Sequence, residues 1–434
     1  MKNNLLKTLF AGLFLSMLAP LTASADVVIN ETNFPDENFR NYLSSLSYGQ
    51  DGIITDGEIA GITYIDVYRK NISSLKGIEY FTALTKLYCD RNQLTSLDVS
   101  KNTALRYLNC DHNQLTSLDV SKTLTDLNCS SNQLTSLDVS GCTALTMLYC
   151  DYNQLTSLDV SKNTALTWLA CYSNQLTSLD VSKNTALTEL DCDNNQLIAL
   201  DVSKNTALKE LQCRSNQLTS LDVSKNTALT TLYCNNNQLT SLDIPKNTAL
   251  TTLNCYNNQL TSLDVSKNTA LKELQCWYNK LTSLNVSGCT ALTTLNCYNN
   301  KLTSLDVSGC TALKSLWCPQ NQIKGESMDA LINGLPQNIT NENYDLYVIY
   351  YYGEGNICTK PQVAMAKAKG WIPQKYSYNA GWQEYEGSDD EPAGIADVKA
   401  GCNTDAPIYT LSGQKVANVK KGIYIKNGHK VVIK

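Results

Sequence analysis

The sequence has little of the chemistry that most enzyme active sites need. Histidine occurs only at His112 and His429 in 434 residues, and neither is adjacent to a serine or a cysteine. No glycine-rich loop of the kind that cradles phosphate groups is present. The paired carboxylates Asp191 and Asp193 are candidates for acid–base work, but such pairs on a charged strand face are usually solvated. We therefore expect no enzymatic activity and no cofactor.

Strong charge of either sign is also missing. The net charge is −5, 17% of the residues are charged, and lysine and arginine form no basic stripe. Proteins that bind nucleic acid carry such a stripe on one face, because it neutralises the phosphate backbone. Nucleic acid is therefore excluded as the expected partner.

Long apolar runs are missing after the first 25 residues, and no later stretch approaches the ~18 apolar residues of a membrane span. Residues 1–25 are typical of a signal peptide, with Lys2 and Lys7 before the apolar segment Leu9–Leu18 and the small residues Ala23–Ala25 at its end. No cysteine follows, so a lipid anchor is not expected. The sequence predicts a secreted, extracellular or outer-surface protein.

What the sequence has in abundance is a repeat of 21 residues. Read from Leu105, it runs Leu-x-x-Leu-x-Cys-x-x-Asn-x-Leu, followed by Thr-Ser-Leu-Asp-Val-Ser and a Lys-Asn-Thr-Ala link. Self-similarity at this period predicts a solenoid, because one coil cannot bury its apolar face and stacked coils can. One step is shortened, between Cys110 and Cys129. The register is marked by Cys89, Cys110, Cys129, Cys150, Cys171, Cys192, Cys213, Cys234, Cys255, Cys276, Cys297 and Cys318.

The spacing within one coil predicts its geometry. In Tyr107–Asp111, Leu108 and Cys110 point to one side of a short strand and the alternate residues to the other. Each coil should therefore add one strand to a parallel sheet, with the core completed by Leu105, Leu115, Leu118 and Val120. An asparagine three residues after each cysteine never varies, and we expect it to turn inward and bond backbone groups where the strand ends.

Seventeen cysteines in an exported protein would ordinarily indicate disulfides. Parallel side chains on coils ~4.8 Å apart leave the Cβ atoms near ~5 Å, beyond the ~3.5–4.5 Å that a disulfide prefers. We therefore expect a ladder of buried free thiols that pack as small apolar groups. Zinc ligation is the alternative, but two histidines and buried thiols give it little to work with. The five cysteines outside the ladder are Cys142, Cys289, Cys310, Cys358 and Cys402, of which Cys289 and Cys310 form a candidate disulfide.

The repeat resembles a leucine-rich repeat with cysteine in place of one leucine, and residues 62–322 are similar to the cysteine-ladder members of the internalin-like family. Residues 73–81 also resemble the linker of internalin coils. The resemblance implies a right-handed coil with a parallel sheet on its concave face, here in about 13 coils of 21–22 residues. It also implies surface adhesion or interaction with a host, without identifying a receptor. Separately, we expect a monomer that recognises a host or microbial surface protein or glycan, because asparagine, carboxylate and aromatic groups on one face suit either ligand.

Residues 26–61 precede the coils and predict a helical cap. Ser47–Glu58 resembles a calcium loop of the EF-hand type, with Gly52 at the turn. Two earlier ligand positions lack a carboxylate or an amide, which should weaken calcium binding severely. The sequence favours a helix–loop–helix cap that keeps the shape without the ion. The remaining calcium candidates are Asp51 and Glu58.

Residues 323–386 predict a cap at the other end of the solenoid. Ile323 is the last repeat-like core residue, Gly325–Pro336 and Lys360–Gly370 have helical patterns, and Asp345–Tyr352 is strand-like. An uncapped coil would expose its core and a strand edge, so these elements should cover the open end.

An acidic linker, residues 387–395, leads to a separate β-rich unit at 396–434. Strand patterns flank Asn427-Gly428, a common hairpin signal. The segments Leu411–Val416 and Lys421–Ile425 resemble the C-terminal sorting domain of type IX secretion substrates, although the unit is short. That resemblance implies display on, or release from, a Gram-negative outer membrane.

A polar ladder also recurs outside the strand. We expect its carboxylates to accept hydrogen bonds in turns while nearby lysines soften the repulsion between them. A column that binds cations is the alternative. The carboxylates are Asp98, Asp119, Asp138, Asp159, Asp180, Asp201, Asp222, Asp243, Asp264 and Asp306.

The outward strand positions vary from coil to coil, whereas the inward positions hardly change. Aromatic residues are frequent at the outward positions, and their large, stiff, amphipathic side chains suit a contact surface. Intrinsic strand preference and drift among duplicated repeats offer an alternative explanation. The candidate ligand-binding residues are Tyr149, Trp168, Tyr172, Tyr233, Tyr256, Trp277, Tyr278, Tyr298 and Trp317. The sequence therefore favours a binding protein, with a structural spacer as the alternative.

Overall fold

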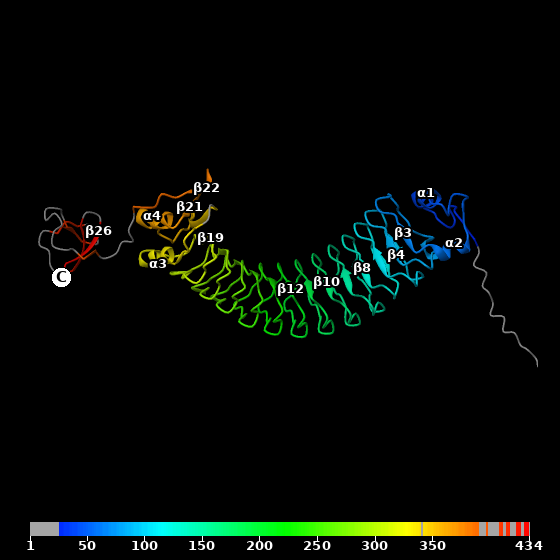
Figure 1. The fold of residues 1–434 in the computed structure, drawn as a ribbon, viewed down its shortest axis with the longest axis horizontal. Helices are drawn as coiled ribbons and strands as arrows, with labels where there is room; N and C mark the ends of the chain where they lie inside the picture. The colour runs from blue at the N-terminus through cyan, green and yellow to red at the C-terminus, as the bar shows by residue number, and fades with distance from the viewer. Residues whose placement is uncertain are drawn as a thin grey trace, which may run out of the picture.

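The computed structural model describes residues 26–339 and 342–389, together with 396–397, 408–410, 414–416, 422–426 and 429–433. It shows an arc of stacked coils whose strands follow the inner, concave side (Figure 1). The expected signal peptide, Cys402 and most of the acidic linker lie outside the described residues. None of the described helices is long and apolar enough to cross a membrane.

One 16-stranded sheet unites the coils, and its order follows the chain from β3 at one edge to β22 at the other. Neighbouring strands of the repeats pair in parallel, one repeat apart, so that Leu169 lies opposite Leu148 and Leu190. The predicted leucine-rich repeat solenoid is thereby confirmed. The repeat strands are β3 (Tyr64–Asp66), β4 (Lys86–Tyr88), β6 (Tyr107–Asn109), β8 (Asp126–Asn128), β9 (Met147–Tyr149), β10 (Trp168–Ala170), β11 (Glu189–Asp191), β12 (Glu210–Gln212), β13 (Thr231–Tyr233), β14 (Thr252–Asn254), β16 (Glu273–Gln275), β18 (Thr294–Asn296) and β19 (Ser315–Trp317).

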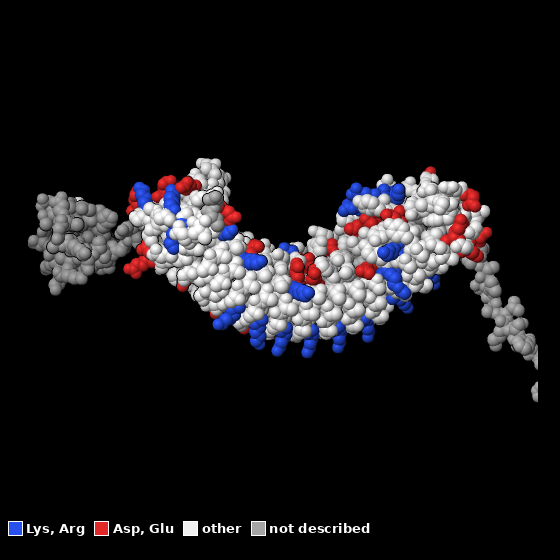
Figure 2. Space-filling view, in the orientation of Figure 1, with Lys and Arg blue, Asp and Glu red and all other residues white. Residues whose placement is uncertain are grey.

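Short strands also form on the other side of the coils, at β5 (Ser96–Asp98) with β7 (Ser117–Asp119) and at β15 (Ser262–Asp264) with β17 (Ser283–Asn285). Here the polar ladder behaves as expected, since carboxylates such as Asp159 and Asp180 accept the backbone N–H two residues later at 2.8 Å. Basic side chains line the convex edge in Figure 2, where the repeat places an exposed lysine in most coils.

In the regular cysteine coils the core consists of the predicted leucines, the cysteine and a valine, which is Ile244 in one coil, and all of these side chains are buried. Each fully buried side chain of this size contributes about 1.5–3 kcal/mol relative to an exposed one. The asparagine ladder closes the strand end as predicted. Asn195 is typical: its Nδ2 donates to the carbonyl oxygens of Cys171 at 3.0 Å and Cys192 at 3.2 Å, while its Oδ1 accepts the Leu176 N–H at 3.0 Å.

The shortened coil departs from the prediction in one respect. Leu118 and Val120 are only half-buried, although they pack against the core, whereas their counterparts in the other coils are buried. The link is shorter in this coil, and its buried Ser121 donates from Oγ to the Asn102 carbonyl at 2.9 Å.

A second ladder, which the sequence analysis did not predict, runs along the links. Asn184 donates from Nδ2 to the carbonyls of Val160 and Asn163, both at 2.9 Å. Cys289 and Cys310 occupy the same position and donate to backbone carbonyls instead, at 3.2 Å to Val265 and 3.5 Å to Val286. Both are free thiols, so the candidate disulfide between them is not formed. All sixteen described cysteines are free and buried.

The N-terminal cap consists of α1 (Glu37–Ser45), α2 (Asp56–Gly61) and a two-stranded antiparallel sheet of β1 (Val27–Val28) with β2 (Ile53–Ile54). Asp36 caps α1 by accepting the Phe39 N–H at 2.9 Å and fixes the helix to the first coil by accepting from the Ser73 N–H and Oγ at 2.7 Å. A 3-10 turn, η1 (Ile78–Tyr80), follows in the first coil.

The C-terminal cap consists of α3 (Glu326–Gly334), β20 (Tyr344–Ile349), α4 (Lys360–Ala368), β21 (Trp371–Ser377) and β22 (Gly381–Glu384). The two predicted helices and the first strand are present, whereas β21 and β22 were not predicted.

The expectation that the repeat ends at Ile323 is wrong, because the cap extends the coil pattern. β20 pairs in parallel with β19, with Leu346 opposite Leu316. Asn356 then continues the asparagine ladder, accepting the Ile323 N–H at 2.9 Å and donating to the Cys318 carbonyl at 2.8 Å. The last strand, β22, runs antiparallel to β21 and forms the edge of the sheet.

The predicted β-rich unit contains a four-stranded sheet of β23 (Ala396–Asp397), β24 (Ile408–Tyr409), β25 (Gly422–Lys426) and β26 (His429–Ile433). β25 and β26 pair antiparallel, as the expected hairpin requires.

Candidate ligand-binding face

The concave face carries three columns of side chains, because the 21-residue register places equivalent positions side by side. The first and second columns come from the first and third residues of each strand, as with Trp168 and Ala170 in β10. The third column comes from the residue two positions after the strand, as with Tyr172. Every aromatic candidate lies in one of these columns except Tyr278, which follows the third column in a left-handed backbone conformation with φ of 50°.

Aromatic side chains gather at the C-terminal third of this face into what we call the aromatic patch. The rings of Tyr256 and Trp277 stack with centroids 4.0 Å apart, and those of Trp317 and Tyr347 stack at 3.6 Å. Tyr278 joins Trp277 to Tyr298 through contacts of 5.2 Å on each side. The patch consists of Tyr256, Trp277, Tyr278, Tyr298, Trp317, Tyr347, Tyr350, Tyr376 and Trp382.

Four members of the aromatic patch belong to the C-terminal cap and were not among the candidates predicted from the sequence. Tyr350 contacts Tyr298 at 5.4 Å and stacks on Tyr376 at 4.7 Å. Trp382 on β22 packs edge-on against Trp317 at 5.2 Å, so the cap contacts the last aromatic residue of the repeat strands. The sequence does show several tyrosines close to Tyr347. The cap, however, lacks the 21-residue period, so the sequence does not indicate which of these tyrosines lies beside Trp317.

The aromatic patch encloses an open hollow of about 320 Å³. Tyr278 and Tyr298 meet at its rim with hydroxyl oxygens 3.4 Å apart. Burial raises the pKa of Tyr298, and the hydrogen bond to Tyr278 adds to this effect. Tyr298 therefore stays neutral at physiological pH, and the pair presents hydroxyl groups beside flat rings. Such a hollow suits a ligand with both polar and apolar faces.

Tyr233 stands apart from the aromatic patch. Its ring lies 5.1 Å from the guanidinium carbon of Arg214, which favours a cation–π contact, and no ring contact joins it to Tyr256 among the described residues. The structure therefore divides the nine sequence candidates into the aromatic patch, Tyr233, and a second group in the middle of the face.

The second group surrounds what we call the acidic hollow, a space of about 200 Å³. It opens at Ala170, the one alanine in the second column, where the neighbouring strands carry Tyr149 and Asp191. Acidic side chains are visible on the inner side near the middle of the arc (Figure 2). The hollow is lined by Tyr149, Asp151, Trp168, Ala170, Tyr172, Glu189, Leu190, Asp191, Glu210 and Gln212.

The carboxylates in and beside the acidic hollow differ in the hydrogen bonds and ion pairs that they form. Asp151 accepts from Ser130 Oγ at 2.7 Å, and Asp193, just outside, forms an ion pair with Arg214. Asp191 accepts only the backbone N–H of Asp193, at 3.1 Å, within the described part of the chain. Burial, reinforced by the charge of Asp193, raises the pKa of Asp191 to about 7.

Replacing Asp191 with asparagine is expected to stabilise the protein at pH 8 and to change its stability little at pH 4. The folded protein keeps a proton on Asp191 that the unfolded chain releases above its ordinary pKa of 3.8, so this contribution to stability is full below that pH and is lost as pH rises through about 7. The gain should be about 1–2 kcal/mol after solvent screening.

The measurement is the difference in Tm between Asp191→Asn and the parent chain at each pH from about 4 to 8. Asp180→Asn is a control of opposite sign, because backbone hydrogen bonding to Ser182 lowers the pKa of Asp180. A difference for Asp191→Asn that does not change with pH would contradict the assignment.

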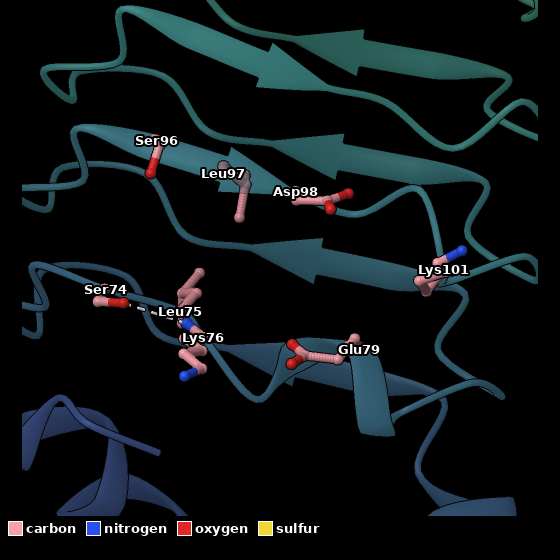
Figure 3. Close-up of a pocket in the computed structure, with 8 residues that line it drawn as sticks. All are labelled: Ser74, Leu75, Lys76, Glu79, Ser96, Leu97, Asp98 and Lys101. Atoms are coloured by element: carbon pink, nitrogen blue, oxygen red, sulfur yellow. Dashed lines mark hydrogen bonds between the residues drawn. The ribbon is translucent and has the colours of Figure 1, made fainter. Parts of the chain in front are cut away.

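The convex side also carries a hollow, of about 380 Å³, between the first coil and β5 (Figure 3). Its two carboxylates serve local turns: Glu79 accepts the Gly77 N–H and Asp98 accepts the Ser100 N–H, both at 2.8 Å. The lining is mixed in charge, with Lys76 and exposed Lys101 beside these acids. Nothing in this arrangement selects one kind of ligand.

The calcium candidates are used in the same local way. Glu58 closes a capping box at α2, accepting from the Thr55 N–H at 2.9 Å, and Asp51 accepts the Ile53 N–H at 3.1 Å. Among the residues that the structure describes, no group of three or more histidine, cysteine, aspartate or glutamate side chains is placed to hold a metal ion. The donor set of this loop does not fit calcium.

Comparison with known proteins gives a consistent picture. The family described as Leucine Rich repeats (2 copies) matches residues 122–163, 206–247, 227–268 and 269–308. Internalin J of Listeria monocytogenes serotype 4b is 43% identical over 71 residues, which is 16% of this chain and only 8% of that protein.

Among solved structures, the functional domain of InlJ from Listeria monocytogenes, described as including a cysteine ladder, is 32% identical with a TM-score of 0.59. That similarity covers 94% of this chain and 98% of the domain. An internalin, inlF, of the same species has a TM-score of 0.63 at 24% identity, over 74% of this chain and 100% of that one, and shows the fold alone.

Proposed function

Because the chain belongs to the internalin-like leucine-rich repeat family, we propose that it is a non-catalytic, adhesin-like binding protein that holds a protein or glycan ligand on its concave face. The observation that carries this proposal is the aromatic patch. It brings aromatic side chains from the last coils and the C-terminal cap onto one side of the sheet.

The physical case rests on rigidity and on the chemistry of aromatic rings. The rings of the aromatic patch are held by stacking and edge contacts, so little conformational entropy is lost when a ligand covers them. Exposed clusters of this kind usually mark interaction sites, and aromatic anchors dominate the energetics of many interfaces. Asn296 and the tyrosine hydroxyls add hydrogen-bonding groups around the hollow.

A structural spacer is the second candidate function. The solenoid is a stiff rod of roughly 60 Å at ~4.8 Å per coil, which suits a stalk. A spacer, however, needs only polar outward groups, and stacked pairs such as Trp317 with Tyr347 serve no purpose there. The aromatic patch therefore favours the binding role.

We also propose that the protein acts outside the cell, as a secreted or surface protein. Two observations support this proposal. Residues 1–25 have the pattern of a signal peptide, and internalin-like relatives are surface or secreted proteins. The resemblance of Leu411–Val416 to a type IX sorting domain supports passage through an outer membrane, with host or microbial surface molecules as the partners.

Replacing both Trp277 and Trp317 with alanine is expected to weaken ligand binding at least about thirtyfold, the loss typical of two interface anchors. The ligand would first be found by applying the full chain to arrays of glycans and host surface proteins. Far-ultraviolet circular dichroism should show the same secondary structure, because both rings lie on the concave face and not in the core between the coils. Tyr107→Ala, which removes an outward aromatic of β6 that lines neither hollow, is the matched control and should leave binding unchanged. Undiminished binding by the double variant would refute the aromatic patch as the ligand site.

A further inference from the structure

The acidic hollow is separate from the aromatic patch and has its own chemistry. Tyr172 and Trp277 occupy the same column five coils apart, which corresponds to about 24 Å along the sheet. The hollow exists because Ala170 stands where the adjacent strands place Tyr149 and Asp191, leaving space between larger neighbours. It is thus a cavity formed by sequence variation within an otherwise regular face.

Two kinds of side chain form its walls. Tyr149 and Trp168 lie together with ring centroids 5.8 Å apart and an interplanar angle of 37°. In the first column, Glu189 lies directly beside Trp168 on the next strand, and Glu210 lies beside Glu189 one strand further along. Aromatic faces and carboxylates attract the same kind of group, a planar or compact cation.

The negative charge of the hollow has little internal compensation. No hydrogen bond or ion pair of the described residues involves the Glu189 carboxylate, and Glu210 accepts only from the side-chain amide of Gln212, at 2.6 Å. The nearest guanidinium, that of Arg214, is already paired with Asp193. Lys209 is exposed and acts on Glu189 only through its charge.

We propose that the acidic hollow binds an arginine side chain of a protein ligand, with the guanidinium stacked on Trp168 and bonded to the carboxylates of Glu189 and Glu210. The proposal rests on the binding role of the concave face and specifies the chemistry of one contact. It favours a protein over a glycan as the ligand, because glycans do not carry a guanidinium.

Arginine fits this site better than other cations do. Its guanidinium is planar, so it can stack on an aromatic ring while its N–H groups reach carboxylates at the edge. Lysine offers a strongly hydrated point charge that gains less from the ring. A divalent metal would need several converging ligands, and the described residues hold no such group.

The test uses the full chain labelled with 5-fluorotryptophan, whose five tryptophans give one fluorine NMR signal each. The probe is the peptide acetyl-Gly-Arg-Gly-amide, and the matched control is the same peptide with citrulline, which is isosteric but neutral. The signal of Trp168, identified with Trp168→Phe, is expected to shift saturably with a Kd in about the millimolar range. The citrulline peptide should bind at least about tenfold more weakly. A third peptide, acetyl-Gly-Lys-Gly-amide, compares the two cationic side chains. Equal binding of the arginine and citrulline peptides, tighter binding of the lysine peptide, or no shift of the Trp168 signal would each overturn the proposal.

Two variants separate charge from space. Glu189→Gln with Glu210→Gln removes the two carboxylates proposed to bond the guanidinium and should abolish the shift. Ala170→Leu keeps the charge and fills the hollow, and it should also abolish the shift. Both should fold, since equivalent outward positions already carry Tyr149, Gln212 and threonines. Retained binding by either variant would contradict the assignment.

Failure of this inference can be told apart from failure of the proposed function. If Trp277→Ala with Trp317→Ala loses the array ligand while the arginine peptide does not bind the parent chain, only the arginine site is wrong. If the peptide binds at Trp168 but the double variant keeps its array ligand, the aromatic patch is wrong and the hollow stands.

Discussion

Replacing Asn195 with cysteine is expected to lower the free energy of unfolding by about 3–6 kcal/mol, whereas the same replacement at Asn184 should cost less than about 1 kcal/mol. Asn195 satisfies the carbonyls of Cys171 and Cys192 and the N–H of Leu176, all of which are buried. A thiol cannot accept and donate in these directions at once, so buried backbone groups would lose their partners.

Asn184 is a matched control supplied by the chain itself. Its position in the link is occupied by cysteine at Cys142, Cys289 and Cys310, each donating to a carbonyl of the preceding coil. The side-chain oxygen of Asn184 is buried and has no hydrogen-bond partner among the residues that the structure describes, so replacing it with cysteine removes no hydrogen bond made by this atom. Urea denaturation followed by circular dichroism measures both variants. Similar losses at the two sites would show that the ladders are equivalent.

The second large effect concerns the thiols. In a chain with Cys402→Ser, none of the sixteen described cysteines should react with iodoacetamide at pH 8 while the protein is folded, and all sixteen should react after denaturation without reductant. Burial raises the pKa of Cys255 and Cys297 to about 12, so the thiolate fraction at pH 8 is about a thousandfold smaller than for a free cysteine. Burial also blocks access of the reagent.

The number of alkylated thiols is counted by intact mass. Lys183→Cys, at an exposed position of the link, is the positive control and should be labelled at once. Several labels on the folded protein would show that the coils open readily. Fewer than sixteen labels after denaturation would show that some thiols are bridged, against the ladder of free thiols.

Much of the fold follows from local periodicity. The alternation of Leu108 and Cys110 determines which side of the strand faces inward, and the invariant Asn113 marks where the strand ends. These inferences hold because each coil contacts chiefly its two neighbours, so one coil repeats the environment of the next. The second ladder at Asn184 was not predicted because three coils carry cysteine and the shortened coil carries Ser121 at its position, which hides the shared role of donating to a carbonyl.

The candidate site followed only partly from the sequence. Tyr256, Trp277 and Tyr298 were recognisable because they recur at one position of the repeat. Their partners Tyr350 and Trp382 come from a cap without a period, and only the pairing of β20 with β19 brings them to the same face.

The sequence by itself determined the solenoid, its register and its buried ladders, because these depend on contacts between residues a fixed distance apart in the chain. The tertiary structure alone decided where the sheet ends, how the outward aromatics divide into groups, and that Ala170 leaves a cavity between carboxylates and rings. Those features depend on side chains from different coils meeting in space, and no spacing along the chain specifies the volume that they leave.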